Sequence, residues 1–485
     1  MDRARAPLTQ LAIAHYRFHI PNFGFRNICN LEYLEFVIWN SWRSKEMKIA
    51  ITTLGCKVNQ YDAAVMQSRL EEQHSFVPFE EQADCYVINT CTVTDRADWE
   101  ARQLIRRAKR LNPAAKVLVT GCYAQVNPDD VAGVAGVDYV VGLNRLDDLL
   151  RFVNAPPASA TQVAVSDVKR ERGVAVYGTR ALPGHTRAFL KVQEGCNYSC
   201  TYCIIPTARG LSRSVMPHEV MEQVRQLADA GYKEIVLTGI HLGGYGQELT
   251  PRIDLTSLVE MIDASRMMPR IRLSSLDPRE VPKRLLDLMA DSKTVCPHLH
   301  ICAQAGDDRI LKAMRRNYDR GYYRDLLARV RERLPDAALG SDIIVGFPGE
   351  TDAQFEGSLE YFASLPLTYF HVFPYSSRRG TVAAALPDHV PEPVKKLRGR
   401  RMRELGARKK REFYSSFLGR LASVLVEERI DSATGMRRGF TPNYLQVSLA
   451  GAEDIANQEI DVRLNGLRDG CLTGSISDAY LSFDR

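Results

Sequence analysis

The sequence lacks any apolar run long enough to cross a membrane. In 485 residues no hydrophobic stretch approaches the roughly 18 to 20 residues that a transmembrane helix needs. The first residues also lack an apolar segment followed by a small-residue cleavage site, which is the pattern of a secretory signal peptide. These absences argue against a membrane protein and a secreted protein, so we expect the chain to lie in the cytoplasm.

An even, closely spaced set of cysteines is also lacking. The eleven cysteines are an odd number in a long chain, which does not fit a disulfide framework. In a reducing compartment thiols stay free, and clustered thiols then indicate metal binding. Six of the eleven fall into two groups of three.

Acidic residues are almost absent from one segment near the C-terminal end. Between Lys395 and Arg411 ten basic residues accompany one acid, Glu404, so the segment carries +9 and the remaining chain −3 of the total +6. Such a concentration of charge indicates a surface that contacts phosphates, although a solvated helix face has the same composition. The ten residues are Lys395, Lys396, Arg398, Arg400, Arg401, Arg403, Arg408, Lys409, Lys410 and Arg411.

One group of three cysteines lies on a single short segment. Cys196, Cys200 and Cys203 have the spacing C-x3-C-x2-C, with Tyr202 just before the last. Structural zinc usually has four protein ligands, and an electron-carrying cluster usually has four cysteines. Three thiolates can bind three irons of a cubane cluster and leave the fourth iron open. The spacing therefore indicates a cluster that binds a small molecule; the alternative is a chance group of core cysteines.

A strand-like run, a cysteine and a helix-like segment follow one another three times between residues 48 and 153. The runs are 48–53, 85–89 and 116–120, and the cysteines are Cys56, Cys91 and Cys122. Alternating strands and helices predict a parallel sheet, and the loops after its strands meet at one edge. We therefore expect the three cysteines to converge in a second three-thiolate site. Cys85, inside a strand, is expected to be a small buried hydrophobe.

The helices of these units have recognisable ends. We predict them at 61–72, at 95–111 with Thr94 as N-cap, and from Pro128 with Asn127 as N-cap. Further strand-like runs predict a partial β/α barrel with its chemistry at the strand ends; they are 189–192, 234–238, 270–274, 298–302 and 341–345. Short alternating runs at 421–427, 444–449 and 458–464 predict a small β-barrel reminiscent of oligonucleotide-binding barrels.

The chain is therefore expected to be α/β, with several domains. The proposed division is an N-terminal extension of no assigned function, 1–46, which reads as an upstream extension or a misassigned start; a parallel-sheet domain, 47–155; a linker, 156–181; the partial barrel, 182–412; and the small β-barrel, 413–481.

Four segments resemble the radical S-adenosylmethionine (SAM) methylthiotransferases. They are Thr53–Asp62, Asn89–Val93, Gly121–Gln125 and Gly195–Cys200, and the resemblance extends from Met47 to near the C-terminus. The run Gly-Cys-Lys-Val-Asn at 55–59 is similar to the MtaB subgroup, whereas MiaB-type members tend to have Gln-Met-Asn after that Gly-Cys. The resemblance implies a methylthiotransferase N-terminal domain, a radical SAM core and a C-terminal TRAM domain.

The resemblance also implies a reaction and its cofactors. The enzyme would add a methylthio group to C2 of N6-threonylcarbamoyladenosine at position 37 of tRNA. It would use two 4Fe-4S clusters, one on Cys196, Cys200 and Cys203 and an auxiliary one on Cys56, Cys91 and Cys122. One SAM would donate the methyl group, and another would give the radical that acid–base side chains cannot generate. The electron donor and the sulfur source are unidentified, and the oligomeric state is open.

Five residues resemble contacts that the superfamily makes to SAM. They are Tyr202 beside the adenine, Thr238 and Gly239 at the amino group, and Gln304 and Asp342 at the ribose. Glycine lacks a side chain and so permits a close approach of the cofactor. The alternative interpretation of Tyr202 is that it is an ordinary aromatic residue of the core. The residues around Gln304 depart from the usual Leu-Gln-Ser-Gly pattern. Cys296, Cys302 and Cys471 are expected to be structural.

The tRNA is expected to be bound mainly through its phosphates. Besides the basic segment and the small barrel, a second candidate surface is formed by arginines after Cys91, at Arg96, Arg102, Arg106, Arg107 and Arg110. Three alternative functions stay open. They are methylthiolation of isopentenyladenosine in tRNA, methylthiolation of a ribosomal protein, and non-catalytic RNA binding by a protein with structural metal.

Overall fold

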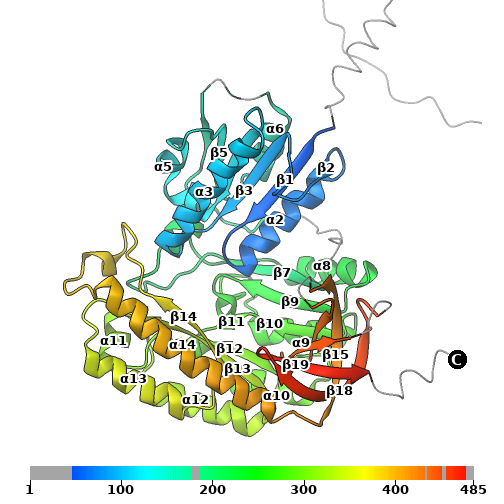
Figure 1. Cartoon of the computed structure of the whole chain (residues 1–485), viewed down its shortest axis with the longest axis vertical. Helices are drawn as coiled ribbons and strands as arrows, with labels where there is room; N and C mark the ends of the chain where they lie inside the picture. Colours follow the sequence, from blue (N-terminus) through cyan, green and yellow to red (C-terminus); the bar gives the residue numbers. More distant parts are fainter. Residues whose placement is uncertain are drawn as a thin grey trace, which may run out of the picture. The chain divides into compact units, whose positions relative to one another are not determined.

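The computed structural model describes residues 46–476, except 157, 159, 177–185, 432–433 and 451–454 (Figure 1). The expected N-terminal extension lies outside the described residues apart from Glu46, as do part of the expected linker and the end of the expected small barrel. No helix within the described ranges is long and apolar enough to span a membrane.

The first sheet is entirely parallel, as predicted, with strand order β2-β1-β3-β4-β5-β6. Its strands are β1 (Lys48–Thr53), β2 (Ser75–Phe76), β3 (Cys85–Thr90), β4 (Lys116–Gly121), β5 (Tyr139–Val141) and β6 (Gln162–Ala164). One face packs on α2 (Lys57–Leu70) and α6 (Leu146–Asn154). The other packs on α3 (Asp95–Leu111), α4 (Cys122–Val126) and α5 (Pro128–Ala132).

The central strand β3 shows why this sheet is parallel and covered on both faces. All six of its residues are buried, and they alternate between the two cores. Tyr86 and Ile88 belong to one core, whereas Cys85 and Val87 belong to the other. Cys85 is therefore a core side chain, as predicted, and burial raises the pKa of its thiol to about 12.

The helix ends differ from the predictions in two places. Thr94 is the N-cap of α3, as predicted, and its side chain accepts a hydrogen bond from the Ala97 N–H at 3.2 Å. The prediction of a side-chain cap at Asn127 is wrong, because its backbone N–H instead bonds to the Tyr123 carbonyl and closes α4. Helix α2 begins at Lys57, directly after Cys56 and earlier than predicted. In the expected linker segment, β6 pairs with β5.

The second part is a curled parallel sheet of the β/α type. Among the described residues six parallel strands follow the order β7, β9, β10, β12, β13, β14. The first three and the last three are joined by one isolated bridge, from Ile271 in β10 to Val295 in the chain before β12. These strands are β7 (Arg187–Glu194), β9 (Glu234–Gly239), β10 (Arg270–Leu273), β12 (His298–Ile301), β13 (Ala338–Val345) and β14 (Tyr369–Pro374). The short strands β8 (Arg213–Ser214) and β11 (Ser275–Leu276) lie at the sheet edges. The predicted partial barrel is confirmed.

Helices cover the outer side of this curled sheet, and their apolar faces join its core. They are α8 (Pro217–Asp229), α9 (Leu255–Ser265), α10 (Lys283–Asp291), α12 (Arg320–Arg333), α13 (Asp352–Ser364) and α14 (Glu392–Ser415). Shorter helices lie in the loops: α7 (Ile205–Arg209), α11 (Asp308–Ala313), η1 (Val168–Arg170), η2 (Leu242–Gly244), η3 (Pro278–Glu280) and η4 (Val382–Ala385).

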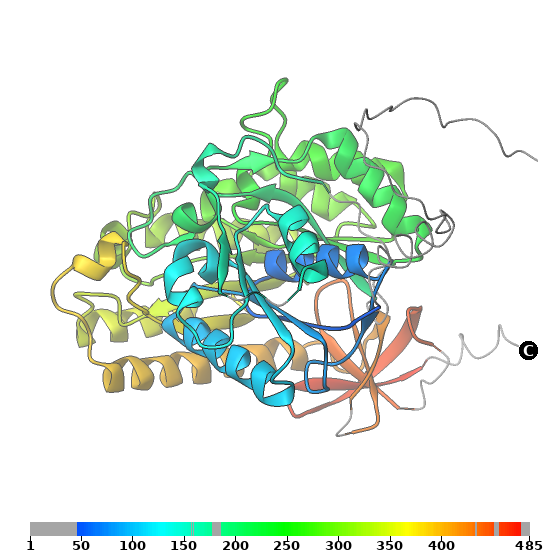
Figure 2. The same ribbon diagram turned by 90° about the horizontal axis from the view of Figure 1, so that it is seen from above.

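The predicted small β-barrel is present in the C-terminal part. It is closed, with strand order β15-β16-β17-β19-β18. The strands are β15 (Leu421–Ile430), β16 (Arg437–Phe440), β17 (Gln446–Leu449), β18 (Glu459–Arg468) and β19 (Cys471–Ile476). Figure 2 shows the barrel, in orange and red, at the end of α14. It contacts the curled sheet through Arg270 and Arg272, which donate to the carbonyls of Phe440 (2.7 Å) and Pro442 (2.9 Å).

Candidate active site

The first three cysteines follow three neighbouring strands of the N-terminal sheet. Cys56 precedes α2, Cys91 follows β3, and Cys122 begins α4. A Cβ built on Gly55, whose φ is +105°, would lie 2.8 Å from Cys91 Cβ, so only glycine lets the Cys56 loop approach the Cys91 loop this closely. Burial, opposed by Arg209 and reinforced by the charges of Cys91 and Cys56, raises the pKa of Cys122 to about 12. The three thiols therefore lie within electrostatic range of one another.

The other three cysteines lie on the loop after β7. Burial raises the pKa of Cys203 to about 12 and that of Cys196 to about 11, and the charge of Cys200 contributes to both shifts. The loop is ordered by backbone contacts: the Tyr198 N–H donates to Cys196 Sγ at 3.4 Å, and the Cys203 N–H donates to the Cys200 carbonyl at 3.1 Å. Metal binding at such thiols must displace protons.

The two groups fit an iron–sulfur cluster better than a single metal ion. Thiolates around one tetrahedral zinc lie roughly 3.8 Å apart, given a Zn–S distance of about 2.3 Å. Among the described residues, one group of Cys, His and acidic side chains has all its ligand atoms within 4.8 Å of one another: His300, Cys302 and Asp342. Neither cysteine triplet is part of such a group. Neither triplet has the compact spacing of a single tetrahedral ion, and cysteine thiolates are the usual ligands of iron–sulfur clusters.

Arg209 connects the two cysteine groups, and no sequence pattern indicated this role. This guanidinium is only 1% exposed. Its Nε donates to Cys122 Sγ at 3.3 Å, and its Nη1 donates to Glu194 Oε1 at 2.7 Å. Its Nη2 donates to Asn59 Oδ1 at 2.5 Å and to Asp62 Oδ2 at 3.1 Å. Because Glu194 lies two residues before Cys196, one side chain contacts both Cys122 of the first cysteine group and the strand that leads to the second group.

A second buried arginine contacts the other cysteine group. Arg316 Nη1 donates to Cys200 Sγ at 3.1 Å, Nη2 pairs with Asp277, and Nε donates to the Tyr318 hydroxyl at 3.1 Å. Tyr202 lies in the same environment: burial is the main cause of its strongly raised pKa, and the charge of Arg316 opposes the shift. Sequence reasoning missed Arg316 because it lies 113 residues after Cys203 in the chain.

Thr238 and Gly239 lie beside the cluster loop. Gly239 is paired with Gln193 across β9 and β7, and the Gln193 amide donates to the carbonyls of Glu194 and Gly195 at 2.9 and 2.8 Å. A Cβ on Gly239 would lie 2.9 Å from Gln193 Oε1. Thr238 is buried. The lack of a side chain at Gly239 therefore lets Gln193 pack against it, at the edge of the sheet next to Cys196.

Gln304, which follows β12, lies beside Asp342 in the neighbouring strand β13. The Gln304 N–H donates to the Asp342 carbonyl at 2.9 Å, and Gln304 has a φ of +62°, which is uncommon for a residue with a side chain. The Asp342 carboxylate accepts from His300 at 3.0 Å, from His371 at 3.3 Å and from the Cys302 thiol at 3.4 Å. Burial opposes ionisation of Asp342, but the two histidines outweigh it and lower its pKa.

Lys57 lies among charged side chains of the curled sheet. It follows Cys56, and its ammonium is within electrostatic range of Arg272, Arg187, Glu234 and Asp342. Burial, followed by the two arginines, lowers its pKa to about 8. Within the described part of the chain Glu234 is hydrogen-bonded to Arg272, Arg187 pairs with Glu427, and no hydrogen bond or ion pair engages Lys57.

The structure removes three residues from the expected phosphate-contacting surface on α14. Lys395, Arg398 and Lys409 are buried. They donate to the Tyr375 carbonyl at 3.0 Å, to Glu350 Oε2 at 2.7 Å and to the Leu365 carbonyl at 2.6 Å. These contacts attach α14 to the curled sheet, so the interpretation of these three as phosphate contacts is wrong. The other seven basic residues of the segment are exposed or half-buried.

Some arginines of α3 have partners in the structure, and others are exposed without an ion pair among the described residues. Arg96 pairs with Glu100 at 2.7 Å, Arg102 donates to the Tyr123 hydroxyl at 2.9 Å, and Arg107 lies 3.6 Å from Glu80. Arg106 and Arg110 are exposed and have no ion pair within the described residues. Trp99 on the same helix is 54% exposed. Sequence reasoning did not single out this tryptophan.

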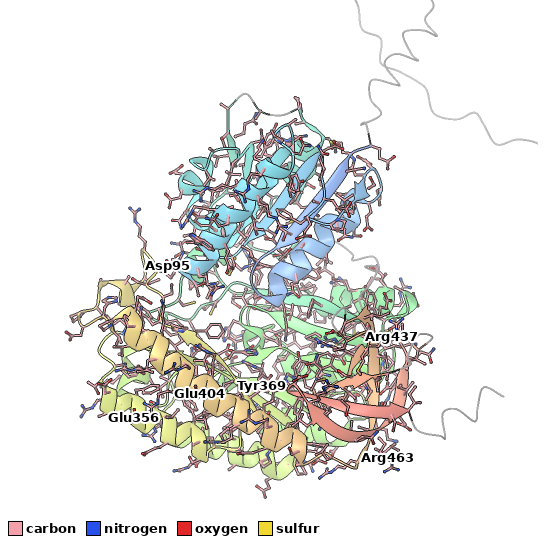
Figure 3. All side chains as sticks on the ribbon, in the orientation of Figure 1. Asp95, Glu356, Tyr369, Glu404, Arg437 and Arg463 are labelled. Carbon is pink, nitrogen blue, oxygen red and sulfur yellow. The ribbon has the colours of Figure 1, made fainter. Side chains whose placement is uncertain are left out.

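The N-terminal sheet also contacts the chain after β14. Arg378 donates to Thr92 Oγ1 at 2.6 Å and forms ion pairs with Asp95 and Asp98 at the start of α3. The Asp95 N–H donates to Ser376 Oγ at 2.9 Å, and Figure 3 shows Asp95 at this junction. Thr92 follows Cys91, so these contacts position the Cys91 loop against the curled sheet.

Comparisons with known proteins agree with this arrangement. Residues 48–142 match the family model described as "Uncharacterized protein family UPF0004", and residues 190–362 match the radical SAM superfamily. The threonylcarbamoyladenosine tRNA methylthiotransferase MtaB of Bacillus subtilis is 40% identical and covers 86% of this chain and 93% of its own length. The Aquifex aeolicus protein of that name is also 40% identical, covering 84% of this chain and 98% of its own length. The chain belongs to the radical SAM methylthiotransferases.

A relative with a different printed name and a solved structure are also similar to this chain. A tRNA-2-methylthio-N(6)-dimethylallyladenosine synthase of Pelotomaculum thermopropionicum is 33% identical and covers 89% of this chain and 98% of its own length. The solved radical SAM methyltransferase TsrM from Kitasatospora setae has a TM-score of 0.50 at 16% identity, and the match covers 70% of this chain and 77% of that one. That likeness shows the fold alone.

Proposed function

We propose that this methylthiotransferase adds a methylthio group to C2 of N6-threonylcarbamoyladenosine in tRNA, beside the anticodon. The observation that carries the proposal is the 40% identity, over more than nine-tenths of their own lengths, to relatives named for this reaction. Relatives named for dimethylallyladenosine are 31 to 33% identical. The immediate electron donor and sulfur source are further partners that the reaction requires.

The six cysteines would bind two 4Fe-4S clusters: Cys196, Cys200 and Cys203 one, and Cys56, Cys91 and Cys122 the other. When bound, these groups supply the electron that cleaves SAM and the sulfur that is transferred. The side chains of the protein position the cysteines. Arg209 fixes Cys122 against the strand that leads to Cys196, and Gln193 orders the backbone before that cysteine. Tyr202, Thr238, Gly239, Gln304 and Asp342 remain the proposed SAM contacts.

Lys57 supports the choice of a threonylcarbamoyl substrate. The threonyl group carries a carboxylate, whereas an isopentenyl group carries no charge. Lys57 is a cation beside Cys56 whose described neighbours leave it without a direct partner. An ammonium in a partly buried site binds a carboxylate by a charge-assisted hydrogen bond, which is stronger than a neutral one.

Two exposed basic surfaces support a tRNA substrate. On α14, Lys396, Arg400, Arg403 and Arg411 are exposed and share one face by the helical period. On α3, Arg106 and Arg110 share one helix face with the exposed Trp99. Phosphate contacts would give affinity, and an exposed aromatic can stack on an unpaired base.

The test is mass spectrometry of tRNA nucleosides from a strain that lacks this gene, complemented with the wild-type chain or with variants. We expect 2-methylthio-threonylcarbamoyladenosine to disappear in the deletion strain, return with the wild type and stay absent with Cys200→Ala or Cys91→Ala. The matched control is Cys471→Ser, a cysteine of the small barrel outside both triplets, which should restore the nucleoside.

Other outcomes would identify another function. Loss of the methylthio group from isopentenyladenosine alone, or from a ribosomal protein with tRNA unchanged, would overturn the proposed substrate. Full complementation by both cluster variants would instead support a non-catalytic RNA-binding protein. Iron and sulfide analysis of anaerobic protein should give about eight irons per chain, falling to about four when either triplet is removed.

A further inference from the structure

Each three-cysteine site has one buried arginine that donates an N–H to one of its sulfurs. Arg209 donates through Nε to Cys122 Sγ at 3.3 Å, and Arg316 donates through Nη1 to Cys200 Sγ at 3.1 Å. We propose that the two arginines are positioning residues that separately set the reduction potentials of the two clusters. This inference depends on the proposed function only in requiring that both triplets bind a cluster.

Arg209 is too constrained to point elsewhere. The side chain is 1% exposed, and its two terminal nitrogens are engaged by Glu194, Asn59 and Asp62. Those acceptors lie on different elements, α2 and β7, so they fix the plane of the guanidinium. The Nε–H then points at Cys122. A purely structural ion pair would not need this fourth contact.

Arg316 is constrained in the same manner. Asp277 accepts from Nη2, the Tyr318 hydroxyl accepts from Nε at 3.1 Å, and the aromatic ring of Tyr318 lies 5.0 Å from the guanidinium carbon. Asp277 belongs to the loop after β11, and Tyr318 precedes α12. Nη1 is thereby directed at Cys200. The two sites use different nitrogens and unrelated partners, yet each presents a donor to one sulfur.

The expected effect on the clusters is directional. Hydrogen bonds to cysteine sulfur are among the factors that set the potential of an iron–sulfur cluster, because they stabilise the more negative reduced form. The charge of the arginine also acts on the sulfur: the charge of Arg209 lowers the pKa of Cys122 more than its hydrogen bond does. A lysine would keep this charge. The aimed N–H, acting in a dry interior, is therefore the part of the influence that only the arginine supplies.

Lysine variants separate the hydrogen bond from the charge. Arg209→Lys keeps the cation but removes the Nε–H, and Arg316→Lys does the same at the other site. We expect Arg209→Lys to lower the potential of the auxiliary cluster alone, and Arg316→Lys that of the other cluster alone. The reduction equilibrium should fall about tenfold, which is about 59 mV for one electron. The measurement is a potentiometric titration followed by electron paramagnetic resonance of anaerobically loaded full-length protein.

The cluster signals are assigned with the two cysteine-triplet variants, each of which retains one cluster. Arg272→Lys is the matched control, because Arg272 is equally buried and ion-paired with Glu234 but contacts neither triplet. It should leave both potentials unchanged. Unchanged potentials in fully iron-loaded Arg209→Lys and Arg316→Lys would overturn the inference, as would equal shifts of both clusters in every variant.

A measurement on the unaltered chain covers the case in which a variant fails to load iron. Wild-type protein containing 15N-arginine should show a 15N hyperfine coupling to each reduced cluster by pulsed electron paramagnetic resonance. Absence of the coupling at either cluster would overturn the proposal for that arginine. None of these readouts uses tRNA, so a wrong substrate assignment would leave them unaffected, and a wrong potential assignment would leave the nucleoside test unaffected.

Discussion

Lys191 and Asp62 form an ion pair, with Lys191 Nζ 2.7 Å from Asp62 Oδ1, that joins the curled sheet to the N-terminal sheet domain. Lys191 belongs to β7, and Asp62 belongs to α2. Lys191 also pairs with Glu194 at 2.9 Å, and its ammonium lies 5.2 Å from the centre of the Tyr61 ring. Together with Arg209, these residues form a buried charged network between the two cysteine groups.

Removing Lys191 should therefore destabilise the contact between the two parts. Lys191→Met keeps the stem but leaves two carboxylates with Arg209 as their remaining cation. Breaking a buried ion pair by removing one partner typically costs about 3 to 5 kcal/mol. We expect a loss of that size in the free energy of unfolding, measured by denaturation of reduced, cluster-free protein.

A double variant checks that this loss comes from the pair. Asp62→Asn added to Lys191→Met should recover part of the lost stability, since one uncompensated carboxylate is then neutral. Equal losses in the single and the double variant would contradict the assignment. Lys283→Met is the matched control, because Lys283 is exposed and pairs with Asp287 on the surface of α10; it should change stability by less than about 1 kcal/mol.

His298 predicts how stability depends on pH. It is buried at the start of β12, bonds to the Tyr369 hydroxyl at 2.8 Å and packs on Tyr444 of the small barrel; Tyr369 is labelled in Figure 3. Burial, followed by the charges of Arg272 and Lys57, lowers its pKa well below the usual value. The unfolded chain then binds a proton below about pH 6.5 that the folded chain does not bind.

The sign follows from this difference in protons. Stability from neutral His298 is complete above about pH 6.5 and falls as the pH decreases, by at most about 1.4 kcal/mol per pH unit. We expect the wild type to lose stability between pH 6.5 and pH 5 more steeply than His298→Gln, measured by denaturation across that range. Equal slopes would show that His298 does not contribute.

That the cysteines of the N-terminal sheet lie near one another could be predicted from the sequence, because local patterns specify their places after the strands. Cys56, Cys91 and Cys122 follow strands of one parallel sheet, and parallel strands bring their following loops to one edge. Arg209 and Arg316 could not be predicted. An arginine is exposed by default, and the sulfurs they contact lie 87 and 116 residues away.

The sequence also could not predict which basic residues of α14 are buried and which are exposed. Lys395, Arg398 and Lys409 are chemically indistinguishable in sequence from their exposed neighbours, because long cationic side chains can cover apolar surface or reach buried acceptors. Only the packing of α14 on β14 and α13 decides which ones turn inward. Strand β14 itself was not predicted, since its half-buried residues do not form a continuous apolar run.

Cluster removal should expose the six cysteines to alkylation in an uneven order. In cluster-free protein Cys56 is exposed, whereas Cys122 is buried with a pKa of about 12. The thiolate is the reactive form, so Cys56 should react with iodoacetamide much faster than Cys122 at pH 8. Peptide mass spectrometry over time measures both rates. Comparable rates would contradict the geometry, and all six should be protected in the loaded protein.

Lys57→Met should separate substrate recognition from the radical chemistry. Loss of a charge-assisted hydrogen bond, worth about 1.5 to 3 kcal/mol, should raise KM for tRNA with threonylcarbamoyladenosine about 10- to 100-fold. SAM cleavage without tRNA should change little, and Lys57→Arg should retain part of the affinity. KM is measured by nucleoside mass spectrometry at varied tRNA concentration. Wild-type KM in Lys57→Met would show that Lys57 does not bind the carboxylate.

The exposed surfaces of α14 and α3 should bind RNA in different ways. The dependence of affinity on salt concentration distinguishes phosphate contacts from base stacking. Substituting Lys396 and Arg403 by Gln should weaken tRNA binding and reduce the slope of log K against log salt by about 1 for each lost phosphate contact. Trp99→Ala should weaken binding by about 1 to 3 kcal/mol through lost stacking and leave the slope unchanged. Filter binding at several salt concentrations measures both effects.

Arg225 on α8 provides the control for general surface charge. It is exposed but already paired with Glu222 at 2.6 Å and Asp229 at 2.8 Å, so it has little charge to offer a phosphate. Arg225→Gln should leave both the affinity and the salt slope unchanged. If Arg225→Gln weakened binding as much as the α14 substitutions do, the effect of those substitutions would reflect long-range charge. If Trp99→Ala changed the salt slope, the role of Trp99 would be electrostatic rather than stacking.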